Sequence, residues 1–525
     1  MAHPVSVPAT TGVTGQMNGQ MNGHTSSQRN CQVDERGVET IAATTPEQRS
    51  VRPLHLWIAV GALGSVGMVL SGSAIGSVPR PAADRWWFTV TTGSGLGAHV
   101  AFYASLVVLL SGWLGVGVHA RRGHLSVRTA WVILALWGLP LFLGTPLFSR
   151  DLYSYVAQGQ LARHGLNPYV VAPAALGHGD LLSSIASVWR NTASPYGPLF
   201  VSVSHLGVAL SGGSLISQIL VFRAIELVGV ALAMVSLPVL ARRLGNDPGL
   251  ALWLAVLSPL ALFSFVSSGH NEALMLGLML AGIALGTGGR LQWGVALCAL
   301  AATIKLPAAA GIVFLVAEEL TRIDRSHLAR RWRTVATSAG VTGLVVAGVT
   351  VGAGLGWTWL SPTALRVPTE LRVLITPLVS IGTFIHGLLH AVGLPVDLRP
   401  IVTVVQAVGG IAAVSSILWM LFHARAGDGV RLCGVALILF VVLSPTLWPW
   451  YLMWGVAVLA ATSVQRSWSL AAVAGLAMLL VGAGGTPMFN GGTYWVTGPI
   501  LLIALAWFLS SGRFVAAIRG PSDGA

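Results

Sequence analysis

Long apolar blocks separated by short polar connections fill the chain from about residue 54 to about residue 511. The longer blocks have about 18 to 25 residues, which is the length that an α-helix needs to cross the ~30 Å hydrocarbon core of a bilayer. We therefore expect spans, in chain order, over residues 54–76, 97–118, 129–147, 216–240, 249–266, 271–289, 291–304, 306–319, 334–356, 400–421, 432–447, 450–464, 468–484 and 496–511. The blocks beside Lys305 and Trp448 are short, so we expect about 12 to 14 spans.

Residues 1–52 lack any apolar block and are rich in Gly, Thr, Ser, Gln and Asn. This composition predicts a disordered tail, which we expect in the cytoplasm. A cleaved signal peptide has its apolar region close to the start, whereas the first block here begins near Leu54 and is long enough to span. We therefore expect a retained helix, followed by a single membrane-embedded domain over residues 53–525.

Composition agrees with this pattern, since 54% of the residues are apolar and 9% are charged. Such a chain lies outside the range of soluble globular proteins and is predicted to be an all-α polytopic membrane protein. The net charge of +13 comes from arginines that flank the apolar blocks, and no basic helix or aromatic RNA-binding motif accompanies them. The charge therefore indicates membrane orientation rather than binding to nucleic acid.

Arginine positions give the orientation. If the N-terminal tail is cytoplasmic, 20 of the 29 arginines fall on the inner side and eight on the outer side, which places both termini inside. The apolar block Leu199 to Leu210 is too short to cross, and we interpret it as interfacial or re-entrant. Counting it as a span would move Arg242 and Arg243 outside, against this bias.

With this topology, the long connections at about residues 148–215 and 357–400 lie outside the membrane. Four polar groupings are predicted to face the same outer side: Arg150 with Asp151, the GHNE at Gly269 to Glu272, Lys305 with Pro307, and the WPWY at Trp448 to Tyr451. Long outer loops beside short inner turns favour an outer reaction face.

The segment SRDLYSYVAQGQLARHGLNPY follows the third span. It is predicted to form a short helix on the surface that begins near Ser149 and ends at Gly165 and Pro168. Asp151 is the candidate general base, with a pKa that we expect Arg150 and the helix dipole to hold low. The alternative is an ordinary helix cap with a surface salt bridge.

Lys305 is the only lysine and lies between two short apolar blocks, in ATIKLPAAA. An ionisable side chain within a membrane indicates function unless it reaches the headgroups. Its predicted role is to neutralise the phosphate of a lipid carrier, shared with Arg372 and, as a second choice, Arg366. The alternative is a lysine that extends to the outer headgroups.

His270, Asn271 and Glu272 begin a predicted helix, where such residues either serve the helix end or hydrogen-bond a polyhydroxylated ligand. The aromatic rings of WPWY either form an interfacial belt or stack on a sugar or a prenyl chain, since Pro445 and Pro449 break the helix there.

The sequence offers no metal site. His386 and His390 lie one helical turn apart without a third ligand, which favours packing over zinc. The cysteines, Cys31, Cys298 and Cys433, lie far apart in the chain and have neither metal-ligand spacing nor a plausible disulfide pairing. We expect no cofactor, and a divalent metal is not supported by spacing.

The order RDLYSY, GLNPY, PYGPLF, ARRLG, GHNE and IKLP resembles the integral-membrane glycosyltransferases of the C fold. More closely, it is similar to the polyprenol-phosphate-mannose-dependent α-1,6-mannosyltransferases that build the mannan core of lipomannan and lipoarabinomannan in actinobacteria. The resemblance covers the chain from about residue 54. It implies Asp151 as the base, a lipid-linked donor, no nucleotide, and inversion at the anomeric carbon. Many members of the wider fold carry two neighbouring acids, whereas Arg150 precedes Asp151 here, which counts against a metal-binding pair.

On this resemblance, we expect an enzyme of the plasma membrane with its active site outside, a polyprenyl-phosphate mannose donor and a lipid-anchored mannan acceptor. Arg150, Lys305 and Arg372 are the predicted contacts of the donor phosphate. The predicted substrate contacts are Tyr153, Tyr155, Gln158, Asn167, Tyr169, Tyr196, His270, Asn271, Glu272, Trp448 and Tyr451.

Two other classes stay open. A transporter or flippase of polyprenol-linked sugars would use Lys305 and Glu226 to line a path. Transporters often contain paired repeats, and the chain has no second copy of RDLYSY or GHNE. The third class is a non-catalytic, lipid-binding subunit of a cell-wall complex.

Overall fold

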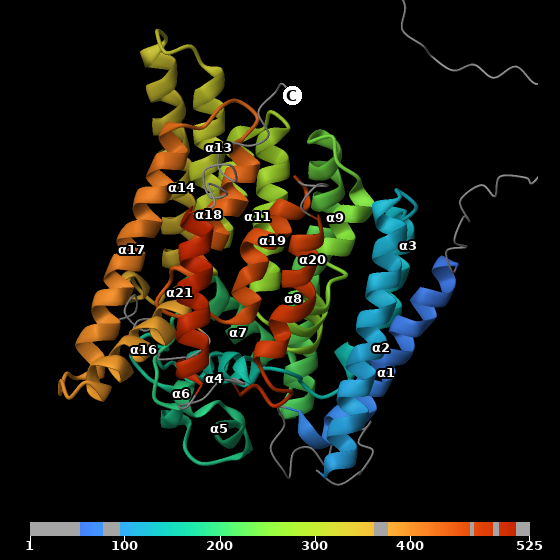
Figure 1. Cartoon of the computed structure of the whole chain (residues 1–525). Coiled ribbons are helices and arrows are strands. Elements are labelled where there is room, and N and C mark those ends of the chain that lie inside the picture. The colour runs from blue at the N-terminus through green and yellow to red at the C-terminus, as the bar shows by residue number, and fades with distance from the viewer. Residues whose placement is uncertain (1–52, 77–94, 362–375, 463–466, 487–492, 511–525) are drawn as a thin grey trace, which may run out of the picture. The chain divides into compact units, whose positions relative to one another are not determined.

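The computed structural model describes residues 53–76, 95–361, 376–462, 467–486 and 493–510. The regular elements of these ranges are helices, packed side by side into a bundle (Figure 1). The prediction of an all-α polytopic membrane protein is therefore confirmed. The predicted tail and the arginines Arg366 and Arg372 lie outside the described residues.

Five helices of the described ranges are long and apolar enough to cross a membrane. They are α1 (Leu54–Ile75), α2 (Leu96–Arg121), α8 (Leu215–Arg243), α14 (Leu328–Ala353) and α17 (Leu398–Phe422). A sixth span is possible if α9 (Pro248–Leu254) continues, after a 54° bend, into α10 (Pro259–Ala261) and the π-helical turn η3 (Leu262–Ser267).

Shorter helices account for the other predicted spans. They are α3 (Val127–Leu143), α11 (Glu272–Thr287), α12 (Leu291–Ala302), α13 (Ala309–Arg322), α18 (Gly429–Val442), η6 (Pro449–Leu452) with α19 (Met453–Ala460), α20 (Ser467–Leu476) with η7 (Ala477–Leu480), and α21 (Tyr494–Ser510). Each predicted span therefore coincides with a helix or a broken helix. Those beside Lys305 and Trp448 are short because a proline follows each of these residues and interrupts the helix.

The remaining helices lie in the two long connections, except for one short turn between α12 and α13. They are α4 (Asp151–Arg163), η2 (Pro173–Leu176), α5 (Asp180–Ser184), α6 (Ser187–Arg190), α7 (Pro198–Leu210), η4 (Leu306–Ala308), η5 (Thr358–Leu360) and α16 (Pro377–Ala391). Figure 1 shows that α4 to α7 gather at one end of the bundle. All the polar groups discussed below as a candidate site lie on or beside these elements.

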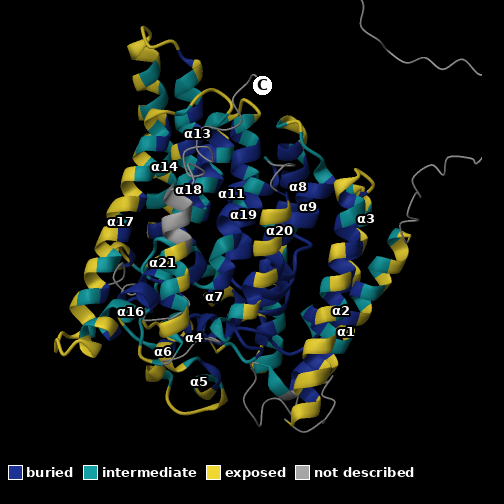
Figure 2. Cartoon of the chain, in the orientation of Figure 1, coloured by how far each residue is buried: buried dark blue, intermediate teal, exposed yellow. Residues whose placement is uncertain are grey.

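The centre of the bundle is built on close contact between α8 and α11. A Cβ atom on Gly229 would lie 2.2 Å from the carbonyl oxygen of Ala273, and one on Gly277 would lie 2.2 Å from that of Gly229. Small residues allow helix backbones to approach in this way, which is how membrane helices gain packing contacts. Figure 2 shows buried residues in this central region and exposed ones along α14 and α17 at the edge.

Helix α4 is buried, so the prediction of a surface helix was wrong. Residues 152–159 are all buried, and a Cβ on Gly159 would lie 2.3 Å from the carbonyl oxygen of Ser204 in α7. The apolar helix α7 covers α4, which the polarity of α4 alone does not reveal. With 13 residues, α7 is about 20 Å long and is too short to cross a membrane by itself.

Candidate active site

A strained turn places Asp151 at the first position of α4. The chain leaves α3 after Leu143 and reaches Phe148, whose φ of 64° lies in the left-handed region that residues other than glycine rarely adopt. The Phe148 amide donates to the carbonyl of Ala483 at 2.7 Å, and the Asp151 amide donates to Ser149 Oγ at 3.1 Å. Backbone strain of this kind persists where neighbouring contacts fix it, and it clusters at functional sites.

The carboxylate of Asp151 meets two partners from distant parts of the chain. Its Oδ1 accepts a hydrogen bond from Trp189 Nε1 at 3.1 Å, and its Oδ2 lies 3.5 Å from His270 Nδ1. The Asp151 side chain is 13% exposed, so it is mostly buried yet accessible. Within the described residues Arg150 forms no ion pair with it, so the surface salt bridge of the alternative interpretation is absent there.

Burial raises the pKa of Asp151 to about 7, and the negative charge of Glu272 acts in the same direction. The Lys305 ammonium and the hydrogen bond from Trp189 act in the opposite direction without compensating. The expectation that Arg150 and the helix dipole hold this pKa low was therefore wrong, because desolvation of the carboxylate is the largest influence. A carboxyl that titrates near neutral pH is suited to general acid–base chemistry.

His270 is presented by the π-helical turn η3 and a tight turn at Gly269. The φ of Gly269 is 59°, and a Cβ there would lie 2.3 Å from Leu152 Cδ1, so a larger residue does not fit. The imidazole stacks on the ring of Trp450 with centroids 4.0 Å apart, and its Nδ1 lies 3.4 Å from the hydroxyl of Tyr155. The GHNE and WPWY segments therefore meet at Asp151.

Glu272 and Lys305 form a buried ion pair through Oε1 of the carboxylate. Glu272 begins α11 and is fully buried, and Lys305, just after α12, is 15% exposed. The other carboxylate oxygen of Glu272 lies 3.8 Å from His270 Nδ1. The pair is therefore continuous with the carboxylate of Asp151 through one imidazole.

Aromatic rings surround the ammonium of Lys305. Its Nζ lies 4.3 Å from the ring centroid of Tyr451, 5.4 Å from that of Trp454 and 5.6 Å from that of Tyr196. Cations are stabilised over aromatic faces at such distances, especially where water is scarce. The rings help to retain a charged lysine in a mostly buried place.

Backbone hydrogen bonds hold the PYGPLF segment against Lys305. The Gly197 amide donates to the carbonyl of Ile304 at 2.9 Å, and the Leu199 amide donates to that of Thr303 at 3.1 Å. A Cβ on Gly197 would lie 2.1 Å from the Thr303 oxygen, so this approach requires glycine. Tyr196 is placed beside Lys305 for this reason.

Arg223 joins the two segments that carry Asp151 and His270. It is buried in α8 and donates to the carbonyls of Phe142 at 2.6 Å and Gly144 at 2.7 Å, and through Nε to that of Ser267 at 2.7 Å. These carbonyls lie at the ends of α3 and η3, where helix carbonyls lack partners and attract cations. Arg223 therefore has a positioning role.

Several buried polar atoms of the site have no hydrogen-bond partner within the described ranges. They are Nε2 of His270, both amide atoms of Asn271, Oε2 of Glu272 and the hydroxyl of Tyr153. Buried polar groups are nearly always paired in folded proteins, and unpaired ones at a site indicate places where a ligand or water binds.

Other predicted contacts lie outside the Asp151 cluster. Gln158 accepts from Ser194 Oγ at 2.9 Å. Asn167 donates to the carbonyl of Leu355 at 3.2 Å and accepts from the amide of Tyr169 at 3.0 Å, which fits a structural role in the loop. Tyr169 packs in a small separate apolar cluster. Trp448 reaches the site through Trp450, on which it stacks with centroids 5.1 Å apart.

Three tryptophans at the site were not among the predicted contacts: Trp189, Trp450 and Trp454. Trp450 belongs to WPWY, whose rings are predicted either to form an interfacial belt or to stack on a sugar or a prenyl chain, and Trp454 follows it by four residues. No sequence pattern indicates Trp189, because it lies in the short helix α6, 38 residues from Asp151.

Metal ligation finds no support in the described ranges, where no three side chains of His, Cys, Asp or Glu are arranged to hold an ion. Asp151, His270 and Glu272 lie close together, but Lys305 occupies one carboxylate oxygen of Glu272. His386 and His390 of α16 have ring centroids 6.2 Å apart.

Fold and site together define a multi-pass membrane protein with a buried carboxylate, histidine and lysine cluster at one end of a helical bundle. The family model described as "Alpha-(1->6)-mannopyranosyltransferase, N-terminal domain" matches residues 58–320, and that of the "MptB C-terminal domain" matches residues 378–512. The chain belongs to this alpha-(1->6)-mannopyranosyltransferase family.

Curated relatives agree with this membership. Alpha-(1->6)-mannopyranosyltransferase A of Mycobacterium tuberculosis is 30% identical over 467 residues, which cover 86% of this chain and 89% of the relative. A probable alpha-(1->6)-mannopyranosyltransferase of Mycolicibacterium smegmatis is 33% identical, over 73% of this chain and 74% of the relative. Alpha-(1->6)-mannopyranosyltransferase A of Corynebacterium glutamicum is 26% identical, over 78% of this chain and 88% of the relative. No solved structure matches the chain.

Proposed function

We propose that this protein transfers mannose from polyprenyl-phosphate mannose to a growing α-1,6-mannan acceptor of lipomannan or lipoarabinomannan, on the extracytoplasmic face of the plasma membrane. The names of the relatives support mannosyl transfer. The arginine distribution supports a site on the outer side with both termini in the cytoplasm. The family resemblance supports the lipid-linked donor.

The proposed reaction is a single displacement. An acceptor hydroxyl attacks the anomeric carbon of the donor, and its proton passes to Asp151. The bond from that carbon to the phosphate oxygen breaks, and the electron pair leaves with the polyprenyl phosphate. Attack from the face opposite the leaving group inverts the centre, so an α-linked product arises from a β-linked donor.

One observation carries this assignment: the Asp151 carboxyl is largely buried, with a pKa raised to about 7, beside a buried lysine. A base is most effective when its pKa is close to the operating pH, because it is then ionised and still accepts a proton readily. The carboxyl must be ionised to act, so we expect activity to rise as the pH increases towards 7 and to level off above it.

Lys305 is the cation best placed to stabilise charge that develops on the leaving phosphate. An ammonium has three N–H donors, and Glu272 takes one of them in the ion pair. Tyr451 is a second hydrogen-bond partner of the ammonium, and the remaining donor is proposed to bind a phosphate oxygen. Arg150 and Arg372 are proposed to assist, although Arg372 lies outside the described residues.

The test uses full-length protein reconstituted in proteoliposomes with a synthetic prenyl-phosphate mannose and a short α-1,6-linked mannoside. We expect Asp151→Asn to lower the rate of transfer by about 10²- to 10⁴-fold, because a positioned base contributes on that order. Binding of the donor should be retained, since the carboxamide preserves shape and the acceptor for Trp189.

The matched control is Asp180→Asn, an exposed acid at the start of α5 in the same connection. Its rate should stay within about twofold of the parent, as for surface substitutions away from a site. An undiminished rate of mannose transfer by Asp151→Asn would refute the assignment of Asp151 as the general base. A parent protein that forms no glycosidic product, yet moves the prenyl lipid across the vesicle, would support a transporter instead.

A further inference from the structure

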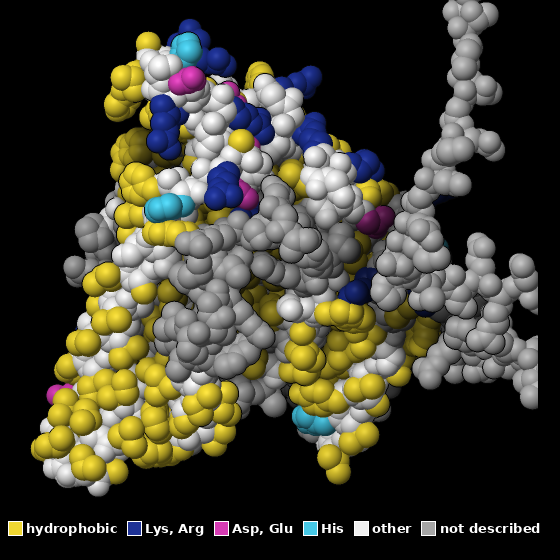
Figure 3. Space-filling view, turned by 45° about the horizontal axis from the view of Figure 1, so that its top comes forward, with side chains coloured by type: hydrophobic (Ala, Val, Ile, Leu, Met, Phe, Trp, Pro, Cys, Tyr) yellow, Lys and Arg dark blue, Asp and Glu magenta, His cyan; other side chains and the backbone are white. Residues whose placement is uncertain are grey.

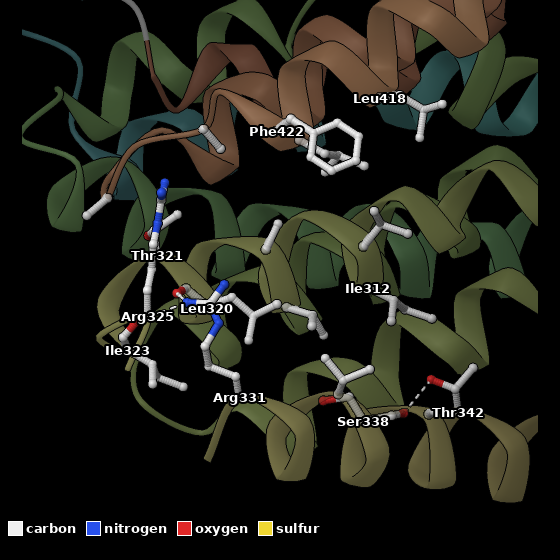
Figure 4. Close-up of a pocket in the computed structure, with 18 of the residues that line it drawn as sticks. Ile312, Leu320, Thr321, Ile323, Arg325, Arg331, Ser338, Thr342, Leu418 and Phe422 are labelled. Atoms are coloured by element: carbon white, nitrogen blue, oxygen red, sulfur yellow. Dashed lines mark hydrogen bonds between the residues drawn. The ribbon is translucent and has the colours of Figure 1, made fainter. Parts of the chain in front are cut away.

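A groove of about 1220 Å³ lies between α13, α14 and α17, away from Asp151. Its walls are mostly aliphatic, and Figure 4 shows Ile312 of α13 and Leu418 and Phe422 of α17 lining opposite sides. None of the side chains of the Asp151 cluster lines it. The groove is therefore separate from the site proposed for catalysis.

One end of the groove is basic. Arg325, Arg331 and Arg425 line it, and its lining contains no Asp or Glu. Arg331 also donates to the carbonyls of Leu320 at 2.6 Å and Ile323 at 2.9 Å, which holds its guanidinium at the end of α13. Figure 4 shows Arg325 and Arg331 together at this end, with Ile312 and Thr342 towards the other.

The exposed arginines of this end are not neutralised by the protein. Arg325 and Arg425 are exposed and form no ion pair within the described residues. Figure 3 shows basic side chains gathered at one end of the molecule above a largely hydrophobic side. An apolar groove that ends in unpaired cations is complementary to an amphiphile with an anionic head.

The helices α14 and α17 that wall the groove are little covered by the rest of the protein. Only 11% of the most apolar window of α14 and 17% of that of α17 are buried within the protein. Along α14 the lining runs from Arg331 to Val346, which is about 22 Å at 1.5 Å per residue. Half of a bilayer's hydrocarbon core is about 15 Å, so an acyl chain from one leaflet fits along this length.

We propose that this groove binds an anionic phospholipid, with one acyl chain between α14 and α17 and the phosphate at Arg325, Arg331 and Arg425. By the arginine distribution this lipid belongs to the cytoplasmic leaflet. The prenyl-phosphate donor does not suit the groove, because its phosphate must reach Lys305. The 14 residues of α13 separate Lys305 from the arginines by about 21 Å.

The first test measures lipid retention. Full-length protein is reconstituted in nanodiscs with equal amounts of phosphatidylglycerol and phosphatidylcholine, extracted into mild detergent, and examined by native mass spectrometry. We expect retained phosphatidylglycerol in the parent and about a 25-fold weaker retention in Arg325→Gln/Arg425→Gln, since each basic residue near anionic lipid contributes about fivefold. Arg331 is left intact because it also caps α13.

The control removes the same charge elsewhere. Arg122→Gln/Arg290→Gln changes two exposed arginines that do not line the groove, and it should keep the parent's phosphatidylglycerol. Equal loss in both double variants would overturn the proposal, because the effect would then follow net charge. The measurement is repeated with a prenyl phosphate added to the same nanodiscs, and retention of the prenyl phosphate in place of phosphatidylglycerol would overturn the proposal as well.

A second pair of variants tests the apolar part of the groove. Gly343 lines the groove and Gly348 does not, and a Cβ on either meets no atom within 4 Å. We expect Gly343→Phe to fill the groove and reduce retained phosphatidylglycerol, and Gly348→Phe to leave it unchanged. Unchanged retention in Gly343→Phe would show that the acyl chain lies elsewhere.

Discussion

The two ends of this helical bundle differ in how far their charged side chains are buried. At the Asp151 end, Glu272 and His270 are fully buried, and Lys305 is 15% exposed and surrounded by aromatic rings. At the arginine end of α13, Arg322 is 48% exposed even though it pairs with Glu318. The Asp151 end therefore buries a few charged side chains, whereas the charged side chains of the arginine end are exposed to water.

The difference matters because desolvation changes the pKa of an ionisable group and the strength of its interactions. A buried ionisable group shifts its pKa and interacts strongly with its neighbours, whereas an exposed one is screened by water and salt. The Asp151 end has the buried, coupled charges that suit a reaction centre, whereas the arginine end has the exposed charges on which the proposed lipid contact depends. Variants that change charge at each end should differ in size accordingly.

The largest effect is expected from breaking the buried ion pair. Lys305→Gln leaves the Glu272 carboxylate buried without its cation, which should lower the free energy of unfolding by about 3–5 kcal/mol. Glu272→Gln should have an effect of similar size. Both are measured by chemical denaturation in a fixed detergent.

The double variant Glu272→Gln/Lys305→Gln supplies the control for this coupling. It should be less destabilised than the sum of the single variants, because no unpaired charge remains, while sugar transfer stays lost. Strictly additive losses would show that the two side chains do not stabilise each other.

An effect of similar size concerns Asp151 and depends on pH. Its pKa rises from 3.8 to about 7 on folding, so the folded state binds the proton more tightly than the unfolded chain. The resulting stabilisation is complete below about pH 4 and is lost as the pH rises to about 7. Asp151→Asn lacks this titration, so it should exceed the parent's stability at pH 8 by on the order of 4 kcal/mol.

The stability difference between Asp151→Asn and the parent should narrow by about 3 kcal/mol when the measurement is repeated at pH 5. Thermal unfolding of both proteins in the same detergent at the two pH values provides the comparison. A stability difference of equal size at the two pH values would mean that the pKa of the Asp151 carboxyl is not raised in the folded protein.

Arg223 is buried like the charges of the site but bonds to carbonyls instead of a carboxylate. Arg223→Met should lower the free energy of unfolding by about 2 kcal/mol, because carbonyls lose their donors while the cost of burying a cation disappears. As a positioning residue, it should also affect turnover more than donor KM, by about tenfold or more. Arg223→Lys should recover only part of both losses, because a single ammonium cannot reach the three carbonyls.

Much of the architecture was predictable because apolar block length determines where membrane helices form. The block predicted at 216–240 is α8, Leu215–Arg243, and the short blocks beside Lys305 are the separate helices α12 and α13. The convergence of the four polar groupings also followed from counting spans. Each grouping was assigned to the same end, and the structure brings them into contact there.

The pairing within the site was not predictable from the pattern. Glu272 and Lys305 meet because α11 and α12 form an antiparallel pair that returns the chain to the same end, but their rotation about their axes is set by packing. Packing also explains the error at Asp151. Its sequence neighbour Arg150 suggested a low pKa, whereas the cover provided by distant elements raises it.

The smallest effect is expected from single charges at the other end of the bundle. Arg290→Gln removes an exposed cation between α11 and α12, and the free energy of unfolding should change by no more than about 0.5 kcal/mol. Sugar transfer should be unaffected, since the guanidinium is solvated in both the folded and the unfolded state and lies one helix length from Lys305. The measurement is the same denaturation series used for Lys305→Gln. A loss close to that of Lys305→Gln would contradict the difference between the ends, because an exposed charge would then stabilise the fold as strongly as a buried pair.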